Sequence, residues 1–385
     1  DWEQRKFCDV AVRASSVSTS SSDIPSVEYE DVVAEEGRLN KDIRLKEAVK
    51  SGIIFDGSQV LYGKLRPYLH NWLNPDFNGI AVGDWWVLKP INMDKNFLYR
   101  LIQTQQFDNI ANQSSGSKMP RADWNLISNS DFMVPFSKEE QCKIGGYFDS
   151  LDNLITLHQR KCEQTKKLKK YMLQKMFPQN GEKVPEIRFD GFTYDWEQRK
   201  LGDDLVSIHT GTNLLGSITN TGMPLIKMGN IQRGYFDTSK VEFLAENEQP
   251  DKADIANYGD FFFNTRNTLE LVGKGATWMK NSGEYAFNSN IARFELRNLD
   301  TIFFNYLYNT DYMTKQIHAR AMGTTSVAAI YPRTLDSVEY LAPCMKEQQK
   351  IGAYFKQLDH LITLHQRKCD ELKKMKKYML QNMFI

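Results

Sequence analysis

The chain has 385 residues, enough for two or three domains of ordinary size. Its 41% hydrophobic and 25% charged residues are typical of a globular protein. The formal net charge of +1 excludes a protein coated in basic residues, but it does not exclude local basic patches that face phosphate.

The cysteines and the apolar runs narrow the class further. Five cysteines are scattered along the chain and no two form a C-x-x-C pair, which argues against zinc ribbons and thioredoxin-like motifs. An odd, scattered set is more typical of a reducing cytosol than of a disulfide framework. No apolar run approaches the ~18–20 residues of a membrane helix, and residues 1–30 are polar and Ser-rich, unlike a signal peptide. We therefore expect a cytoplasmic protein.

A nearly verbatim internal repeat organises the chain. The segment DWEQRK occurs at residues 1–6 and again at 195–200. A longer segment, LITLHQRKCEQTKKLKKYMLQKMF at 154–177, recurs as LITLHQRKCDELKKMKKYMLQNMF at 361–384. The regions between these repeats differ in length and sequence. The chain therefore consists of a variable region, a shared segment, a Pro- and Gly-containing linker at 178–194, a second variable region and a second shared segment.

Each variable region is predicted to be an α+β domain. Short apolar runs predict strands at 60–65, 85–89, 260–264 and 291–296. Longer periodic runs predict helical segments at 96–111 and 302–321. A glycine turn, at Gly57 or Gly259, leads into a strand in each region, and a glycine loop with Ser or Thr follows each helical segment. The two regions thus share a skeleton although their sequences diverge.

The shared segments carry the heptad pattern of helices that pack on other helices. The first copy follows alternating four- and three-residue steps at Ile144, Phe148, Leu151, Ile155, His158, Cys162, Thr165, Met172 and Met176. The second copy does so at Ile351, Phe355, Leu358, Ile362, His365, Cys369, Leu372, Met379 and Met383. Leu154, Leu157, Leu168 and Tyr171 widen the apolar face, and a wider face can serve more than one partner helix. A helix of about 35 residues would span roughly 50 Å.

This order of parts resembles the specificity subunits of Type I restriction–modification systems. The resemblance covers essentially the whole chain. It is carried by the WEQRKL-type opening, by GSQVLYGKLRPYL and GDFFFNTRNTLELVGK in the variable regions, and by QxKIGxYFxxLDxLITLHQRK in the shared helices. It implies an α+β fold in which two target-recognition domains are joined by two long conserved helices. The helices are expected to pack as an antiparallel coiled coil, with pseudo-two-fold symmetry from the internal duplication.

The implied domain boundaries follow the repeats. They are recognition domain 1 at 1–137, helical spacer 1 at 138–177, the linker at 178–194, recognition domain 2 at 195–343 and helical spacer 2 at 344–385.

The resemblance also implies a non-catalytic function, the sequence-specific binding of double-stranded DNA. Each recognition domain would read one half of a bipartite target, while the helices set the unread spacer and dock two methyltransferase (modification) subunits. S-adenosylmethionine, ATP and Mg are expected in the methyltransferase and motor-nuclease (restriction) subunits, and no cofactor or metal is expected in this chain. The sequence agrees, because no Walker A loop and no H-E-x-x-H occur, and Asn74-Pro75-Asp76-Phe77 lacks the second proline of the adenine-methyltransferase motif.

Candidate DNA contacts are side chains that can pair with base edges or fit close to phosphate, in the loops after the glycine turns and after the helical segments. In the first domain they are Tyr62, Lys64, Arg66, Tyr68, Ser115, Ser117, Lys118 and Arg121. In the second they are Asn264, Arg266, Asn267, Thr268, Asn288, Asn290, Thr324, Thr325 and Ser326. Lys64 and Arg266 fall at equivalent positions of the shared skeleton.

Each group of candidates also has a structural interpretation. The turn at Arg66 could be packed, Asn288 and Asn290 could cap a turn, and the glycine loops could be helix C-caps. The lysine runs at 166–170 and 373–377 are more typical of a solvated helix face or a docking surface than of a phosphate clamp.

Candidate partner-binding residues are bulky apolar members of the heptad seam. They are Phe148, Leu151, Ile155, Met172, Phe355, Leu358, Ile362 and Met379. His158 and His365 on the same seam are interpreted as packed polar residues, and Cys162 and Cys369 as small buried hydrophobes. Two other classes remain open. A coiled-coil protein-interaction scaffold without DNA readout would lack basic clefts on its variable regions, and a self-sufficient enzyme is disfavoured by the missing motifs.

Overall fold

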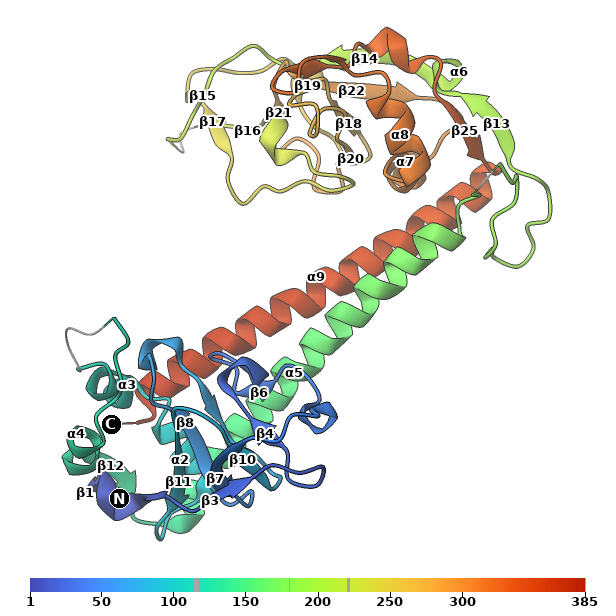
Figure 1. The fold of residues 1–385 in the computed structure, drawn as a ribbon. Helices are drawn as coiled ribbons and strands as arrows, with labels where there is room; N and C mark the ends of the chain where they lie inside the picture. Colours follow the sequence, from blue (N-terminus) through green and yellow to red (C-terminus); the bar gives the residue numbers. More distant parts are fainter. Residues whose placement is uncertain (114–117, 180, 220–221, 385) are drawn as a thin grey trace. The chain divides into compact units, whose positions relative to one another are not determined.

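The protein forms two compact units. A computed structural model describes residues 1–113, 118–179, 181–219 and 222–384 (Figure 1). Unit 1 combines Asp1–Arg160 with His365–Ile385, and unit 2 comprises Lys161–Leu364. Each unit therefore holds one variable region and a part of each long helix. In the described part of the chain, no helix is both long enough and apolar enough to cross a membrane.

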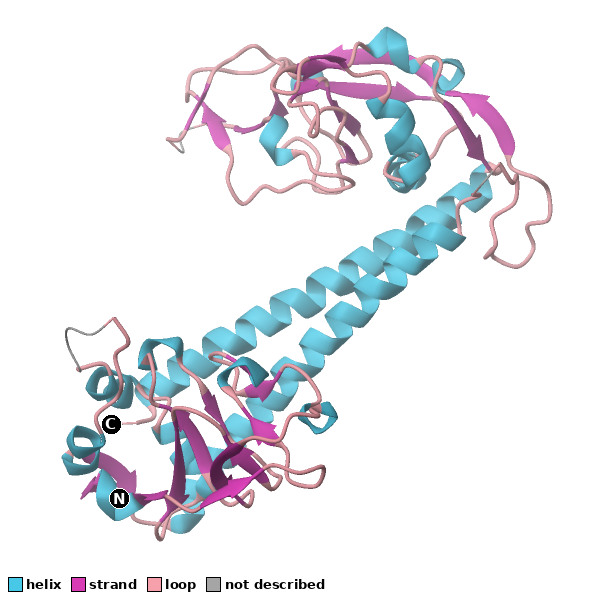
Figure 2. Cartoon of the chain, viewed as in Figure 1, coloured by secondary structure: helices cyan, strands magenta, loops and turns pink. Residues whose placement is uncertain are grey.

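Unit 1 contains two four-stranded sheets with the orders β2-β11-β8-β9 and β3-β7-β10-β4, together with the pairs β1-β12 and β5-β6 (Figure 2). Its strands are β1 (Trp2–Lys6), β2 (Ala11–Ala14), β3 (Val17–Thr19), β4 (Ser26–Val27), β5 (Val32–Val33), β6 (Arg38–Leu39), β7 (Ser51–Phe55), β8 (Val60–Gly63), β9 (Trp72–Leu73), β10 (Gly79–Ala81), β11 (Trp85–Pro90) and β12 (Asp131–Pro135). Its short helices are α1 (Phe7–Val10), α2 (Lys95–Leu101), α3 (Gln105–Ala111) and α4 (Trp124–Asn129), with 3₁₀ turns η1 (Tyr29–Asp31), η2 (Ile43–Leu45) and η3 (Pro67–Leu69).

Unit 2 repeats this plan with the sheets β14-β22-β18-β20 and β15-β17-β16-β21, the pair β13-β25 and a three-stranded sheet β19-β24-β23. Its strands are β13 (Glu197–Lys200), β14 (Leu205–Thr210), β15 (Gly216–Ser217), β16 (Pro224–Ile226), β17 (Glu242–Leu244), β18 (Phe261–Asn264), β19 (Arg266–Asn267), β20 (Gly275–Thr277), β21 (Ala286–Phe287), β22 (Ile291–Leu296), β23 (Met322–Gly323), β24 (Ala328–Ala329) and β25 (Glu339–Ala342). Its short helices are α6 (Leu201–Asp204), α7 (Thr301–Tyr308) and α8 (Asp311–His318), with 3₁₀ turns η4 (Met228–Asn230), η5 (Lys252–Asp254) and η6 (Pro332–Leu335).

Central strands of both units are buried on both faces, which explains their continuous apolar sequences. In β11, Trp86 and Leu88 belong to one hydrophobic cluster, while the alternate residues Trp85 and Val87 belong to another. Strand β18 divides its phenylalanines between two clusters in the same way. The four strands predicted from the sequence are confirmed as β8, β11, β18 and β22.

Each predicted helical segment is two short helices instead of one. A threonine starts the second helix in both units, because its hydroxyl caps the new N-terminus. Thr104 Oγ1 accepts from Phe107 N at 3.3 Å, and Thr310 Oγ1 accepts from Met313 N at 3.4 Å. The chain therefore turns between α2 and α3, and equally between α7 and α8.

The long helices α5 (Lys138–Lys175) and α9 (Met345–Asn382) each begin in one unit and end in the other. Within unit 1 they run antiparallel, since Lys376 Nζ donates to Asp152 Oδ1 at 2.6 Å while His158 and His365 place their Nδ1 atoms 3.0 Å apart. Within unit 2 they are antiparallel as well, as the ion pair between Lys169 Nζ and Asp359 Oδ1 at 2.5 Å and the contact of Cys162 Sγ with the carbonyl oxygen of Ile362 at 3.8 Å require.

A buried glutamine fastens the start of each long helix to its variable region. Gln141 Oε1 accepts from Asp94 N and its Nε2 donates to Pro135 O, which joins α5 to the N-cap of α2 and to the end of β12. Gln348 makes the same two bonds, with Asp300 N and Pro343 O. These bonds position equivalent helices, α2 and α7, against the long helices.

The far end of each long helix completes the core of the unit in which it ends. Phe384, after α9, packs against Phe97 with ring centroids 5.3 Å apart, and against Trp2 at 6.1 Å. Phe177, after α5, packs against Phe303 at 5.7 Å and Trp196 at 6.0 Å. Every unit thus needs the beginning of one helix and the end of the other.

Five of the eight residues predicted to bind a partner are buried in these cores. Phe148, Leu151 and Ile155 are buried in the main cluster of unit 1, and Phe355 and Leu358 in that of unit 2. The other three, Met172, Ile362 and Met379, are partly buried. The buried residues of the heptad seam pack against other parts of the same chain, so they expose little surface to another subunit.

Candidate nucleic-acid interface

The first cluster of predicted contacts comes together in unit 1. The residues after β8 run antiparallel to the segment at 120–122, because Arg66 N donates to Pro120 O at 2.7 Å and Ala122 N donates to Lys64 O at 2.8 Å. This pairing places Lys64, Arg66 and Arg121 at one junction although two of them are more than fifty positions from the third.

Asp84 lies between the cations of this junction. Arg121 donates to its carboxylate from Nε at 3.3 Å and from Nη2 at 3.1 Å, and Lys64 Nζ is 3.5 Å away. The hydrogen bonds from Arg121, aided by Lys64, hold the pKa of Asp84 below its usual range against the opposing effect of burial. The side chain of Arg121 is about half exposed, so it can contact a phosphate while Asp84 orients it.

The remaining unit 1 candidates differ in placement. Tyr68 and Lys118 are exposed, and Arg66 adopts a left-handed backbone conformation with φ of 50° at the start of η3. Ser115 and Ser117 lie outside the described residues. Tyr62 does not occupy an exposed loop: it is 2% exposed and stacks on Trp86 inside the core. Its place in the central strand β8 removes it from the candidate contacts.

The second cluster also assembles, in unit 2. Strand β19 carries Arg266 and Asn267 and pairs with β24, which pairs in turn with β23. Leu269 N donates to Thr325 O at 3.1 Å, so the loop with Thr324, Thr325 and Ser326 lies beside the loop that follows β18. Arg266 and the three hydroxyl residues are exposed, while Asn267 and Thr268 are half-buried. Both units therefore join the loop after a glycine-turn strand to the loop after the short helices.

The asparagines of unit 2 have mainly structural placements. Asn264 ends β18 and is fully buried, so it is not an exposed base reader. Asn288 Oδ1 accepts from Asn290 N at 3.1 Å, which forms the turn predicted as the structural interpretation. Both residues are half-buried, and Asn290 O accepts from Thr265 N.

A basic hollow in unit 2 was missed from the sequence. It has a volume of about 410 Å³ and is lined by Gln232, Arg233, Tyr235, Glu270, Leu271, Lys274 and His318. Arg233 Nη2 lies 3.0 Å from His318 Nε2, and Lys274 Nζ donates to Gln232 Oε1 at 2.8 Å. Burial first, and then the charge of Arg233, lower the pKa of both Lys274 and His318.

One carboxylate, Glu270, lines this hollow beside the two cations, and its charge raises the pKa of Lys274 against the effect of burial. Within the described ranges, neither Arg233 nor Lys274 has a carboxylate within ion-pair distance, whereas Lys64 and Arg121 in unit 1 share Asp84. The two cations outnumber the one carboxylate of the lining, and with an exposed tyrosine and an imidazole they suit an anionic, stackable ligand such as a nucleic-acid strand. Gly273-Lys274 was visible in the sequence, but its neighbours come from segments that only the fold brings together.

The lysine runs of the long helices make contacts within their own units. Lys169 and Lys376 hold the opposite helix through Asp359 and Asp152. Lys166 pairs with Glu163 one turn away. These placements favour the structural interpretation of the runs.

Comparison with known proteins matches this architecture. The model of the family described as the Type I restriction modification DNA specificity domain matches residues 1–167 and 194–374, and the chain belongs to this family. It is accordingly a specificity subunit of a Type I restriction–modification system, a non-catalytic subunit that takes part in DNA recognition.

Individual relatives are distant in sequence. The MjaVIII specificity subunit of Methanocaldococcus jannaschii is 23% identical over 305 residues, which cover 75% of this chain and 69% of that protein. The S subunit of a Type I system from M. genitalium shares the fold with a TM-score of 0.61 at 12% identity, covering 100% of this chain and 96% of that one. A chain from a study of complex assembly and conformational transition in the type I system has a TM-score of 0.51 at 18% identity, with 98% and 96% covered.

The basic hollow generates a prediction about salt dependence. Each lost phosphate contact reduces the slope of log K against log salt by about 0.9 on duplex DNA. The double variant Arg233→Ala, Lys274→Ala should therefore lower the slope for a random-sequence duplex by roughly 2, as measured by fluorescence anisotropy. Lys183→Ala, an exposed lysine of the linker, is the matched control and should leave the slope unchanged. An unaltered slope in the double variant would remove the hollow from the interface.

Proposed function

We propose that this chain reads a bipartite DNA target, one half with each unit. The supporting observation is the repeated junction: Lys64, Arg66 and Arg121 in unit 1, and Arg266 with the loop at 324–326 in unit 2, are assembled by the same pairing of distant loops. The same framework carries different side chains in the two units. Different half-sites would follow, because base-edge recognition depends on those side chains.

We also propose that α5 and α9 form one antiparallel coiled coil that sets the unread spacer between the half-sites. Their antiparallel contacts within each unit support this arrangement. Two readers on one face of a duplex would lie about one helical turn, roughly 34 Å, apart.

The spacer proposal can be tested by lengthening both helices together. Seven residues inserted after Arg160 and seven after Leu364 keep the heptad phase and add about 10 Å to the pair. Methylated adenines are then mapped in a host that expresses each version with its methyltransferase subunits. We expect both half-sites to persist and the spacer to grow by about three base pairs at 3.4 Å each. An unchanged spacer would contradict the proposal, and a one-part motif would contradict bipartite reading.

The docking of methyltransferase subunits is proposed on a second apolar stripe, beside the buried seam. In unit 1 the exposed members are Tyr147, Leu154, Leu157, Met375 and Tyr378. Tyr147 of α5 and Met375 of α9 lie on one side of the helix pair, since Tyr147 Oη contacts Met375 Sδ at 3.8 Å. The repeat supplies Leu168, Tyr171 and Leu364 in unit 2, also exposed. Two related apolar patches are unusual on a free surface and fit two copies of one partner.

The stripe predicts independent loss of each partner copy. Leu157→Asp should remove the methyltransferase subunit at unit 1, Leu364→Asp the one at unit 2, and the double variant both, because a buried charge opposes apolar docking. Native mass spectrometry of the assembled complex measures the stoichiometry. Asn129→Asp adds the same charge to an exposed position of α4, outside the long helices, and should leave two copies bound. Full assembly of the double variant would rule out the stripe as the docking face.

The chemistry of the complex is proposed to lie in the partner subunits. S-adenosylmethionine would be bound by the methyltransferase subunits, and ATP and Mg by the motor-nuclease subunits. We also propose a cytoplasmic location, on the ground that the five cysteines are scattered along the sequence and no two form a C-x-x-C pair. The protein-interaction scaffold is the weaker alternative, because it gives no reason for two basic side chains and an imidazole to gather in the hollow of unit 2.

A further inference from the structure

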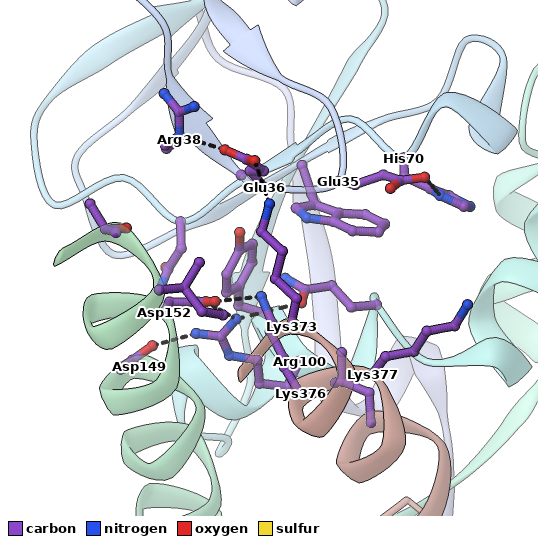
Figure 3. A pocket seen from close by; sticks show the side chains of 18 of the residues that line it. Glu35, Glu36, Arg38, His70, Arg100, Asp149, Asp152, Lys373, Lys376 and Lys377 are labelled. Atoms are coloured by element: carbon purple, nitrogen blue, oxygen red, sulfur yellow. Dashed lines mark hydrogen bonds and ion pairs between the residues drawn. The ribbon is translucent and has the colours of Figure 1, made fainter. Parts of the chain in front are cut away.

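A partly buried charge network joins the variable region of unit 1 to both long helices (Figure 3). Arg100 on α2 is 1% exposed and donates from Nη2 to Asp149 Oδ1 at 2.6 Å and from Nη1 to Asp152 Oδ2 at 2.7 Å. Asp152 also accepts from Lys376 of α9 at 2.6 Å. Three separate segments therefore meet at two carboxylates.

The network is neutral only when all four groups are present. Two cations face two carboxylates at the wall of a cavity of about 850 Å³, and burial lowers the pKa of Lys376 while Asp152 opposes that effect. Removing one member of a buried ion-pair network leaves an uncompensated charge, which is much more costly than replacing the whole network. The identity of each member is therefore coupled to the others.

In unit 2 the equivalent contact between the variable region and the long helices contains a single ion pair. Tyr306 on α7 takes the place of Arg100 and donates from its hydroxyl to Asp359 Oδ2 at 2.9 Å. Lys169 of α5 pairs with the other oxygen of Asp359 at 2.5 Å. Burial, and then the charge of Asp359, raise the pKa of Tyr306, so its phenol stays a neutral donor. One cation and one carboxylate suffice here.

The two long helices differ at the residue that contacts Arg100 in unit 1. The repeat FDSLD in α5 reads FKQLD in α9, so Asp149 corresponds to Lys356, while Asp152 and Asp359 are the same residue. Lys356 does not take part in the contact between Tyr306 and Asp359, whereas Asp149 at the equivalent position of α5 bonds to Arg100. Lys356 donates to the hydroxyl of Tyr258 at 2.7 Å at an exposed site. The helix residue thus changes together with the residue on the variable region.

We infer that the residue at the position of Asp149 or Lys356 is matched to the residue at the position of Arg100 or Tyr306, an acid to the arginine and a non-acidic residue to the tyrosine, and that this match determines which recognition domain can pack on which long helix. An arginine domain on a lysine helix would set two cations, the arginine and the lysine of the opposite helix, against a single carboxylate. A tyrosine domain on an aspartate helix would leave two carboxylates with one cation. A recognition domain would then transfer between helix copies only with its matching residue, so the helices are more than a uniform spacer.

The test is a charge-swap series in the full chain, read by hydrogen exchange of α2. Asp149→Lys should speed exchange in α2 at least about tenfold, because Arg100 and Lys376 would face a third cation. Arg100→Tyr should also speed it. The double variant Asp149→Lys, Arg100→Tyr recreates the unit 2 pair and should restore protection to within about threefold of the parent chain. Helix α7 in the same molecule is the internal reference and should not change.

A matched control separates compatibility from simple loss of a contact. Lys356→Ala removes only an exposed hydrogen bond and should leave α7 protected, whereas Asp149→Ala should expose α2. Where Asp149→Lys does not accumulate, Asp149→Asn replaces it. The Asn change should speed exchange in the parent chain but not in the Arg100→Tyr background. Equal losses in both backgrounds, or a double variant no better than its single changes, would overturn the inference. DNA binding is not measured, so the result stands apart from the proposed function.

Discussion

The structure depends on a bond between the two long helices inside each unit, between an aspartate of one helix and a lysine of the other. Asp152 meets Lys376 in unit 1, and Asp359 meets Lys169 in unit 2. In each unit a residue of the variable region, Arg100 or Tyr306, also donates a hydrogen bond to the aspartate of the pair. Because the paired residues lie 224 and 190 positions apart in the sequence, neither variable region is completed by the long helix next to it alone.

This arrangement separates what must stay constant from what can vary. The buried glutamines, the aromatic cluster around Phe177 or Phe384 and the Asp–Lys pairs recur in both units and hold the short helices in place. The loops at the outer junctions are not used in this packing. They can change their side chains, and with them the DNA sequence they are proposed to read, without loss of the frame.

The helices and central strands were predicted well from the sequence, whereas the exposed contact residues were predicted poorly. Heptad spacing reports helix packing directly, and buried strands such as β11 and β18 are continuous apolar runs, so both were predictable. Tyr62 and Asn264 were predicted to contact DNA but are buried, because the sequence does not show whether a polar side chain on a strand faces the core or solvent. The seam residues are apolar because they face each other within a unit. The flanking residues Leu154 and Leu157 stay exposed.

The basic hollow illustrates the limit of reasoning from sequence. Arg233, Lys274 and His318 are separated by dozens of residues, and no local pattern connects them. Only the pairing of strands and short helices brings them together. The coupling of Asp149 to Arg100 could not be predicted from the sequence either. The two helical repeats differ at this position, but only the structure shows that the residue of the variable region that contacts it differs as well.

The most direct test is to remove the end of α9 and follow the opposite end of the chain. Deleting residues Met379–Ile385 takes away Phe384 and the apolar residues that complete the core of unit 1. Hydrogen exchange should then accelerate in α2, near the N-terminal end of the sequence, while α7, which is closer in sequence to the deletion, keeps its protection. Loss of protection in α7 with α2 unchanged would contradict the account.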